Sequence, residues 1–140
     1  MIMVSSTQSK ARGYSEVLTT GVRVNVESMY LRRQSQPESE RYVFIYVVKI
    51  TNESDKTIQL LDRHWVITDA YGGTEEVQGP GVIGETPRLA PQQSHSYHSF
   101  CPLSTSFGTM SGYYGMVDSL GERFKVEVGL FNLIVPEAVN

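Results

Sequence analysis

Apolar and polar residues alternate along several short stretches of the chain. From Val22 to Glu27, valines alternate with arginine, asparagine and glutamate, and from Arg123 to Val128 apolar residues again occupy every second position. Successive side chains of a β-strand point to opposite faces, so this alternation predicts half-buried strands. No window of ten residues free of Gly and Pro shows a convincing 3.6-residue period. The pattern therefore favours an all-β domain.

A longer stretch, Tyr42 to Ile50, has apolar residues on both faces, with Lys49 as the exception. Nearly all of its residues are β-branched or aromatic, the types enriched in strands. This composition predicts a central strand that is covered on both sides.

Glycine and proline divide the remaining chain. The Gly72–Gly73 pair between two strand-like segments predicts a hairpin. The sequence DSLGE, starting at Asp118, predicts a second hairpin. The segment from Gly79 to Gln93 contains three glycines and three prolines, so no regular element is expected there. Six to eight short strands in about 110 residues are typical of a β-sandwich or barrel.

The length of 140 residues fits one domain. Residues 1–14 are polar and serine-rich without a period, which predicts a flexible N-terminal tail. Residues 15–140 are expected to form a single domain. A polar, Pro37-containing stretch from Arg32 to Glu40 is expected to be a loop.

Charge and cysteine content narrow the functional classes. The net charge is −3, without the basic excess typical of nucleic-acid binders. A nucleic-acid partner is therefore not expected. No apolar run approaches the ~18 residues needed to span a bilayer, so no membrane association is expected either. Cys101 is the only cysteine, which excludes an intramolecular disulfide and is compatible with a cytoplasmic protein.

The sequence Gly79-Pro-Gly81-Val-Ile-Gly84 satisfies GxGxxG, the dinucleotide-binding pattern. That motif must open a helix, and the two prolines that follow forbid one. A weaker hypothesis keeps Gly79, Gly81, Gly84 and Arg88 as ligand-binding residues, since glycine-loop amides can cradle an anion. The alternative is a tight loop whose glycines adopt positive φ, and this structural interpretation is favoured.

Reactive side chains do not form a catalytic or metal-binding pattern. His95 and His98 are three residues apart, so on a strand they point to opposite sides. His95 and Cys101 share a side but lie too far apart to chelate one ion. We therefore expect no metal site, no cofactor and no enzyme activity. Weak all-oxygen binding of Mg²⁺ by the acidic turn residues Asp69, Glu75 and Glu76 stays open.

Tyrosines are the more informative side chains. Tyr113 and Tyr114 are neighbours on a predicted strand and must point to opposite faces, so one of them is expected at the surface. Exposed tyrosine is typical of protein-recognition surfaces. Both are candidate partner-binding residues.

Taken together, several blocks of sequence strongly resemble the ApaG family: RYVFIYVVKITNES, QLLDRHWVITD, VQGPGVIGETPRLAP, CPLSTSFGTMSGYYGMVD and GERFKVEV. The resemblance spans roughly Gly21 to Phe131. It implies a fibronectin type III-like or immunoglobulin-like β-sandwich. It also implies use as a protein-interaction module, an indirect link to Co²⁺ and Mg²⁺ efflux, and a suggested pyrophosphate site in the glycine motif. Pro80 departs from the family pattern, which often has Glu there, and removes a backbone donor from that motif. Phe100 stands where the family commonly has Gly.

The function expected from the sequence is a non-catalytic binding module with a protein partner. A homodimer remains open as an arrangement. The alternative is a sensor of a small ligand or ion, binding pyrophosphate, a dinucleotide or Mg²⁺ at the glycine loop.

Overall fold

The computed structural model describes residues 13–136 of the chain. The described part contains nine strands and two single-turn 3₁₀ helices. The strands are β1 (Gly13–Thr19), β2 (Val22–Tyr30), β3 (Tyr42–Asn52), β4 (Ile58–Asp69), β5 (Thr74–Pro80), β6 (Arg88–Leu89), β7 (Ser94–Leu103), β8 (Phe107–Asp118) and β9 (Arg123–Ile134). The 3₁₀ turns are η1 (Arg32–Gln34) and η2 (Pro37–Ser39).

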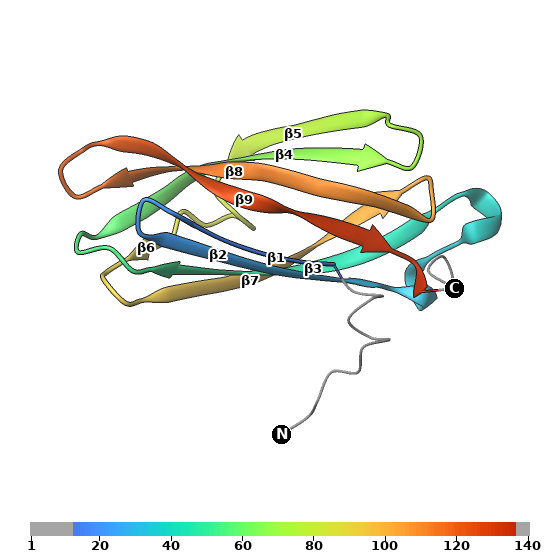
Figure 1. Cartoon of the computed structure of the whole chain (residues 1–140), viewed down its shortest axis with the longest axis horizontal. Helices are drawn as coiled ribbons and strands as arrows, with labels where there is room; N and C mark the ends of the chain where they lie inside the picture. The colour runs from blue at the N-terminus through green and yellow to red at the C-terminus, as the bar shows by residue number, and fades with distance from the viewer. Residues whose placement is uncertain (1–12, 137–140) are drawn as a thin grey trace, which may run out of the picture.

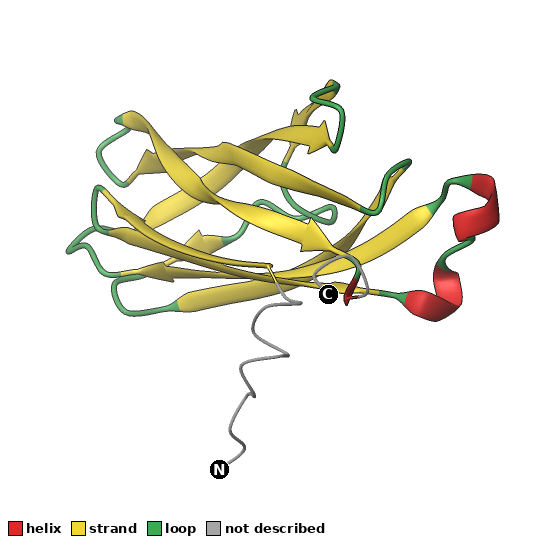
Figure 2. Ribbon diagram, turned by 45° about the vertical axis from the view of Figure 1, so that its right-hand side comes forward, coloured by secondary structure: helices red, strands yellow, loops and turns green. Residues whose placement is uncertain are grey.

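The strands form two antiparallel sheets packed face to face (Figures 1 and 2). One sheet has the strand order β1-β2-β3-β7, and the other has β5-β4-β8-β9 with the short β6 beside β4. The all-β sandwich expected from the sequence is confirmed. Within residues 13–136, no helix is long and apolar enough to cross a membrane.

The core lies between the sheets and is built from the inward side chains of the alternating strands. Val22, Val24 and Val26 of β2 are completely buried. Trp65 of β4 is 3% exposed and its ring packs edge-on against Tyr46 of the facing sheet, with ring centroids 5.4 Å apart. Burial of such large side chains supplies most of the favourable free energy of a domain this size.

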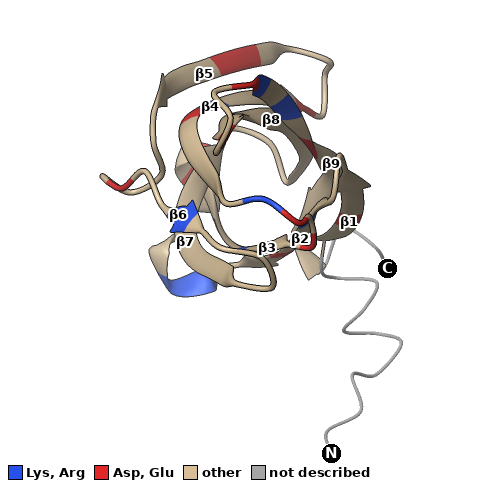
Figure 3. Cartoon of the chain, turned by 90° about the vertical axis from the view of Figure 1, so that its left-hand side faces the viewer, with Lys and Arg blue, Asp and Glu red and all other residues tan. Residues whose placement is uncertain are grey.

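One side of the sandwich is closed by contact between β1 and β9. The Ser28 hydroxyl donates to the Asn132 carbonyl at 2.6 Å and accepts from the Gly13 amide at 3.1 Å. On the other side, β5 and β7 are the edge strands. There the segment that leads from β5 to β6 crosses between the two sheets (Figure 3).

Both predicted hairpins are confirmed, since β4 pairs with β5 and β8 pairs with β9. The strand β1 was not predicted, and its start at Gly13 places Gly13 and Tyr14 in the domain instead of the tail. The sequence pattern does not reveal β1 because one of its inward residues, Ser15, is small and polar, although it is buried with only 8% of its surface exposed. Residues 1–12 of the predicted tail lie outside the described residues.

The prediction for β3 is only half right. The strand is central in its sheet, between β2 and β7, but it is not covered on both sides. Val47 on its outer face is 47% exposed. On the same face, Ile45 pairs with Met29 of β2 and Phe100 of β7, whereas Val47 pairs with the polar Glu27 and His98. We call the apolar side chains gathered around these residues the outer patch. Its members are Tyr14, Met29, Ile45, Val47 and Phe100.

Candidate functional site

The glycine loop that follows β5 closes on itself as a two-residue hairpin. The Val82 amide donates to the Glu85 carbonyl at 2.8 Å, and the Glu85 amide donates back to Val82 at 3.0 Å. Between them, Ile83 and Gly84 have φ of 47° and 75°. Positive φ at both central residues is typical of a type I′ turn. Isoleucine is β-branched and rarely adopts this conformation, so Ile83 is a strained residue, 60% exposed, at the loop tip.

Most backbone donors of this loop are used inside the protein. Pro80 has no N–H, and the Gly81 amide donates to the Leu61 carbonyl at 2.8 Å. A Cβ on Gly81 would collide with the Glu85 carbonyl, and its φ is 61°. Glycine at this position is therefore explained by the tight turn itself.

Arg63 of β4 reaches across to this loop. Its Nη1 donates to the carbonyls of Pro80 and Gly81, both at 2.9 Å. The guanidinium lies directly against Gly79, where a Cβ would approach Nη1 to 3.1 Å. Among the described residues, no carboxylate pairs with Arg63, and its Nε and Nη2 have no hydrogen-bond partner. A half-buried guanidinium whose Nε and Nη2 edge is free can accommodate an anionic acceptor.

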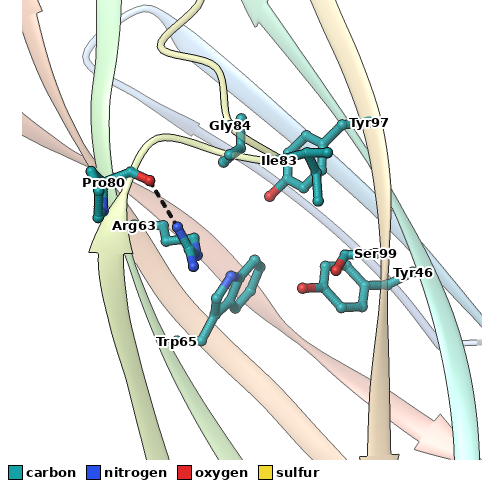
Figure 4. A pocket seen from close by; sticks show the side chains of 9 residues that line it. Tyr46, Arg63, Trp65, Pro80, Ile83, Gly84, Tyr97 and Ser99 are labelled. Atoms are coloured by element: carbon teal, nitrogen blue, oxygen red, sulfur yellow. Dashed lines mark hydrogen bonds between the residues drawn. The ribbon is translucent and has the colours of Figure 1, made fainter.

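A cavity of about 360 Å³ lies beside Arg63, at the side of the sandwich between β7 and the glycine loop (Figure 4). Aromatic rings from both sheets line it, together with the polar side chains of Arg63 and Ser99. It is lined by Tyr46, Arg63, Trp65, Pro80, Val82, Ile83, Gly84, Tyr97 and Ser99. A concave site with aromatic walls and a few convergent polar groups is a usual form of ligand site, and this cavity combines the two in similar proportion.

The phenols at this cavity are hydrogen-bond donors at neutral pH. Burial raises the pKa of Tyr97, and smaller opposing effects come from its hydrogen bond to Tyr114 and from the positive charge of Arg63. The pKa of Tyr46 is raised by burial and is lowered to a lesser extent by a hydrogen bond to Ser99 and by Arg63. The charge of Arg63 therefore acts on the cavity, and no phenolate opposes it.

The structure does not place Arg88 at this cavity. Its Nη2 donates to the Gln59 side chain at 3.1 Å on the outer face of β6 and β4, and it does not line the pocket. Of the predicted ligand-binding glycines, Gly84 alone lines it, while Gly79 makes room for Arg63 and Gly81 shapes the turn. Anion binding by these residues stays a prediction, but the cation beside the loop is Arg63 and not Arg88.

The two tyrosines of β8 point to opposite faces, as the sequence predicts. Tyr114 is completely buried and its hydroxyl is hydrogen-bonded to that of Tyr97, which corrects its prediction as a partner-binding residue. Tyr113 is half-buried on the outer face of its sheet. Its ring stacks on His64 at 4.9 Å, and the Lys125 ammonium lies 4.4 Å from its centroid. Contact of Tyr113 with a partner stays a prediction.

The reactive side chains are dispersed. His95 faces the interior and His98 the solvent, as strand parity requires. The described residues hold no group of three or more His, Cys, Asp or Glu side chains that could ligate a metal. Burial raises the pKa of the Cys101 thiol to about 12. A thiol with that pKa is a poor nucleophile at neutral pH.

Comparison with known proteins identifies the family. The ApaG domain model matches residues 32–118. The chain belongs to the ApaG domain family. A protein named ApaG from Brucella anthropi is 49% identical over 86% of this chain and 92% of its own length. The ApaG protein of Rhodospirillum centenum is 50% identical over 88% of this chain and 94% of its own.

Solved structures agree with this fold. A putative ApaA protein from Bordetella pertussis superimposes with a TM-score of 0.80 at 41% identity, covering 88% of this chain and 95% of that one. A structural-genomics target reaches a TM-score of 0.82 at 42% identity, covering 89% of this chain and 94% of that one.

No sequence motif distinguishes Arg63 as a site residue. The available signal is its position two residues before Trp65, because residues two apart on a strand share a face. A core Trp65 therefore implies that Arg63 also points inward.

Proposed function

We propose that this ApaG-domain protein is a non-catalytic protein-binding module whose binding region is centred on β7. The observation that carries the proposal is the character of this edge strand. It has ten residues, none of them Lys, Arg, Asp or Glu, and pairs on one side only, with β3. Natural proteins usually protect such an edge with charges, proline or a covering element, because it is a template for pairing with another chain.

Both faces of β7 adjoin surface suited to recognition. On its outer face, Phe100 is 53% exposed and lies beside Ile45 of the outer patch. On its inner face, Tyr97 and Ser99 line the aromatic cavity. An exposed apolar surface beside an aromatic, arginine-containing pocket resembles the composition of protein interfaces.

The dispersed histidines and the protonated Cys101 support the non-catalytic part of the proposal, because general acid–base or nucleophilic chemistry needs such groups within hydrogen-bond reach. The cytoplasmic location and the link to Co²⁺ and Mg²⁺ efflux stay predictions from the sequence.

Site-specific photo-crosslinking in cells tests the binding region. A photoreactive residue is placed at His98, on the exposed side of β7, and at Leu120, 75% exposed at the β8–β9 turn. We expect a discrete adduct from position 98 that is absent from position 120. Excess unlabelled protein should compete for the adduct, and the Phe100→Asp variant should not. The absence of a position-specific, competable adduct would contradict the proposed function.

A small-ligand function has one observation in its favour, the free guanidinium edge of Arg63 in the cavity. Titration of the protein with pyrophosphate, followed by amide chemical shifts, separates it from protein binding. Shifts confined to the glycine loop and Arg63 would favour the small ligand.

A further inference from the structure

We infer that the partner supplies an extended segment that adds as a new strand to β7 and places one carboxylate side chain against Arg63. This inference rests on the proposed function and names the chemistry of the ligand. It depends on the backbone of the edge strand, the position of the cavity and the unpaired charge of Arg63.

The backbone of β7 offers an ordered row of free hydrogen-bonding groups. The Asn52 amide donates to the Gln93 carbonyl at 2.9 Å, which fixes the phase of the β3–β7 ladder. Bonding alternates along an antiparallel pair. Tyr97 and Ser99 therefore direct their N–H and C=O groups toward β3, whereas His98 and Phe100 direct theirs to the open edge.

The ladder on the far side of β3 has the same phase. The Leu31 amide donates to the Val43 carbonyl at 2.8 Å. The backbone N–H and C=O groups of Val43 therefore point toward β2, and those of its neighbour Phe44 point toward β7. The first proline on the open edge of β7 is Pro102. The backbone from Ser96 to Phe100 is thus unprotected.

The neighbouring edge strand of the facing sheet, β5, is protected by its sequence. β5 carries Glu75 and Glu76, both exposed, and ends at Pro80. Side-chain charge and proline discourage pairing at a sheet edge. The contrast between β5 and β7 points to β7 as the edge adapted for strand addition.

A strand added to β7 would project every second side chain toward the interior side of the sheet. There it would meet the cavity lined by Tyr97, Ser99 and Arg63. The exposed Ile83 at the cavity mouth would cover an inserted side chain (Figure 4). Strand addition with pockets for alternate side chains is a recurrent mode of peptide recognition.

The charge of the cavity selects the side chain. Arg63 is the cationic residue among those that line it, and it has no carboxylate partner in the described part of the chain. One guanidinium matches one carboxylate in a two-point hydrogen bond, whereas phosphorylated segments are recognised by clusters of Arg. The aromatic walls accommodate the aliphatic part of Glu or Asp. The partner segment is therefore extended and acidic at one inward position.

The test selects linear 12-residue peptides from a random display library on the full-length protein. We expect the bound peptides to share an Asp or Glu at one position flanked by β-branched or aromatic residues. Replacement of that acid by Gln or Asn in a selected peptide should weaken its affinity at least tenfold on the unmodified protein. The Arg63→Gln variant should produce the same loss, while the matched control Arg88→Gln should bind normally.

A backbone variant tests strand addition separately from charge. His98→Pro removes one edge-facing amide and leaves the β3 ladder intact, because a proline on an edge strand loses a bond to solvent only. We expect folded protein, by far-ultraviolet circular dichroism, that no longer binds the peptides. Normal binding by this variant would overturn strand addition.

Other outcomes overturn the inference in distinguishable ways. Peptides without a shared acid, or without sensitivity to Arg63→Gln, would contradict the carboxylate. A second outcome is that pyrophosphate at millimolar concentration displaces the peptides and binds more tightly than they do. That result would assign the cavity to a free anion. Failure to select peptides, with sedimentation showing a dimer that His98→Pro abolishes, would assign the edge to a second copy. In each case a specific adduct from position 98 would leave the proposed function standing, and its absence would remove both.

Discussion

The hydroxyls of Tyr97 and Tyr114 share a hydrogen bond across the interior of the sandwich, joining β7 of one sheet to β8 of the other. Burial is the main cause of the raised pKa of both phenols. This contact holds the inner face of the proposed binding strand against the opposite sheet. It also fixes one wall of the cavity beside Arg63.

Replacing one of these tyrosines by phenylalanine should be costlier than its size suggests. Tyr97→Phe leaves the Tyr114 hydroxyl buried without a partner, which should cost about 1–3 kcal/mol of unfolding free energy. The double variant Tyr97→Phe/Tyr114→Phe removes both polar groups and should lose less than the sum of the single variants. Urea denaturation of all four proteins measures the cycle, and additive losses would contradict a buried pair.

Trp65 is expected to be a principal core anchor. Its ring meets Tyr46, Tyr114 and Phe131 at centroid distances of 5.4, 6.0 and 6.1 Å. Trp65→Ala should cost about 3–5 kcal/mol, measured by urea denaturation followed by circular dichroism. Tyr71→Ala is the matched control, because Tyr71 is 90% exposed and its loss should change stability by about 0.5 kcal/mol or less. A cost below about 1 kcal/mol for Trp65→Ala would refute the anchoring role.

The strained Ile83 predicts a gain of stability on substitution. Asparagine tolerates the left-handed conformation that costs other residues about 1–2 kcal/mol, so Ile83→Asn should raise the unfolding free energy by roughly 0.5–1 kcal/mol. Thermal unfolding of the Ile83→Asn variant and of the unmodified protein measures the difference in stability. The same change at Leu18, 50% exposed within β1, should bring no gain. If Ile83→Asn is destabilising, packing of the isoleucine outweighs its backbone strain.

Cys101 predicts a loss of stability at alkaline pH. Burial raises its pKa from 9.0 to about 12, so the folded protein keeps a proton that the unfolded chain releases. The contribution is fully present below pH 9 and declines as the pH rises from 9 toward 12. Urea midpoints measured across this range should fall, and by less in Cys101→Ala. In the same account, a disulfide reagent at pH 8 reacts slowly with native protein and rapidly in urea.

The fold class could be predicted largely from strand periodicity, since the valines of β2 and the two hairpins indicate half-buried antiparallel strands. The short strand β6 could not, because two residues carry no period and Arg88 takes its place only through pairing with Gln59. Parity placed Tyr113 and Tyr114 on opposite faces, but the choice between them depends on Tyr114 pairing opposite the inward Arg63.

The candidate site was harder to predict because it forms between segments distant in sequence. The glycine motif predicts an anion site made of backbone amides, but the folded loop uses most of those amides internally. Arg63 lies 17 residues from the Pro80 carbonyl that it binds. The apolar outer face of β3 predicts a second covered face, whereas in the structure Val47 remains at the surface. A local pattern reports which residues are apolar, and only the packing shows whether anything covers them.

Hydrogen exchange along β7 tests the central claim most directly. Amide exchange is measured residue by residue, with the protein free and saturated with a selected peptide. Strand addition predicts new protection at Ser96, His98 and Phe100, with little change at Tyr97 and Ser99, whose amides already face β3. Protection that does not alternate along β7, or that appears on other strands instead, would contradict binding at this edge.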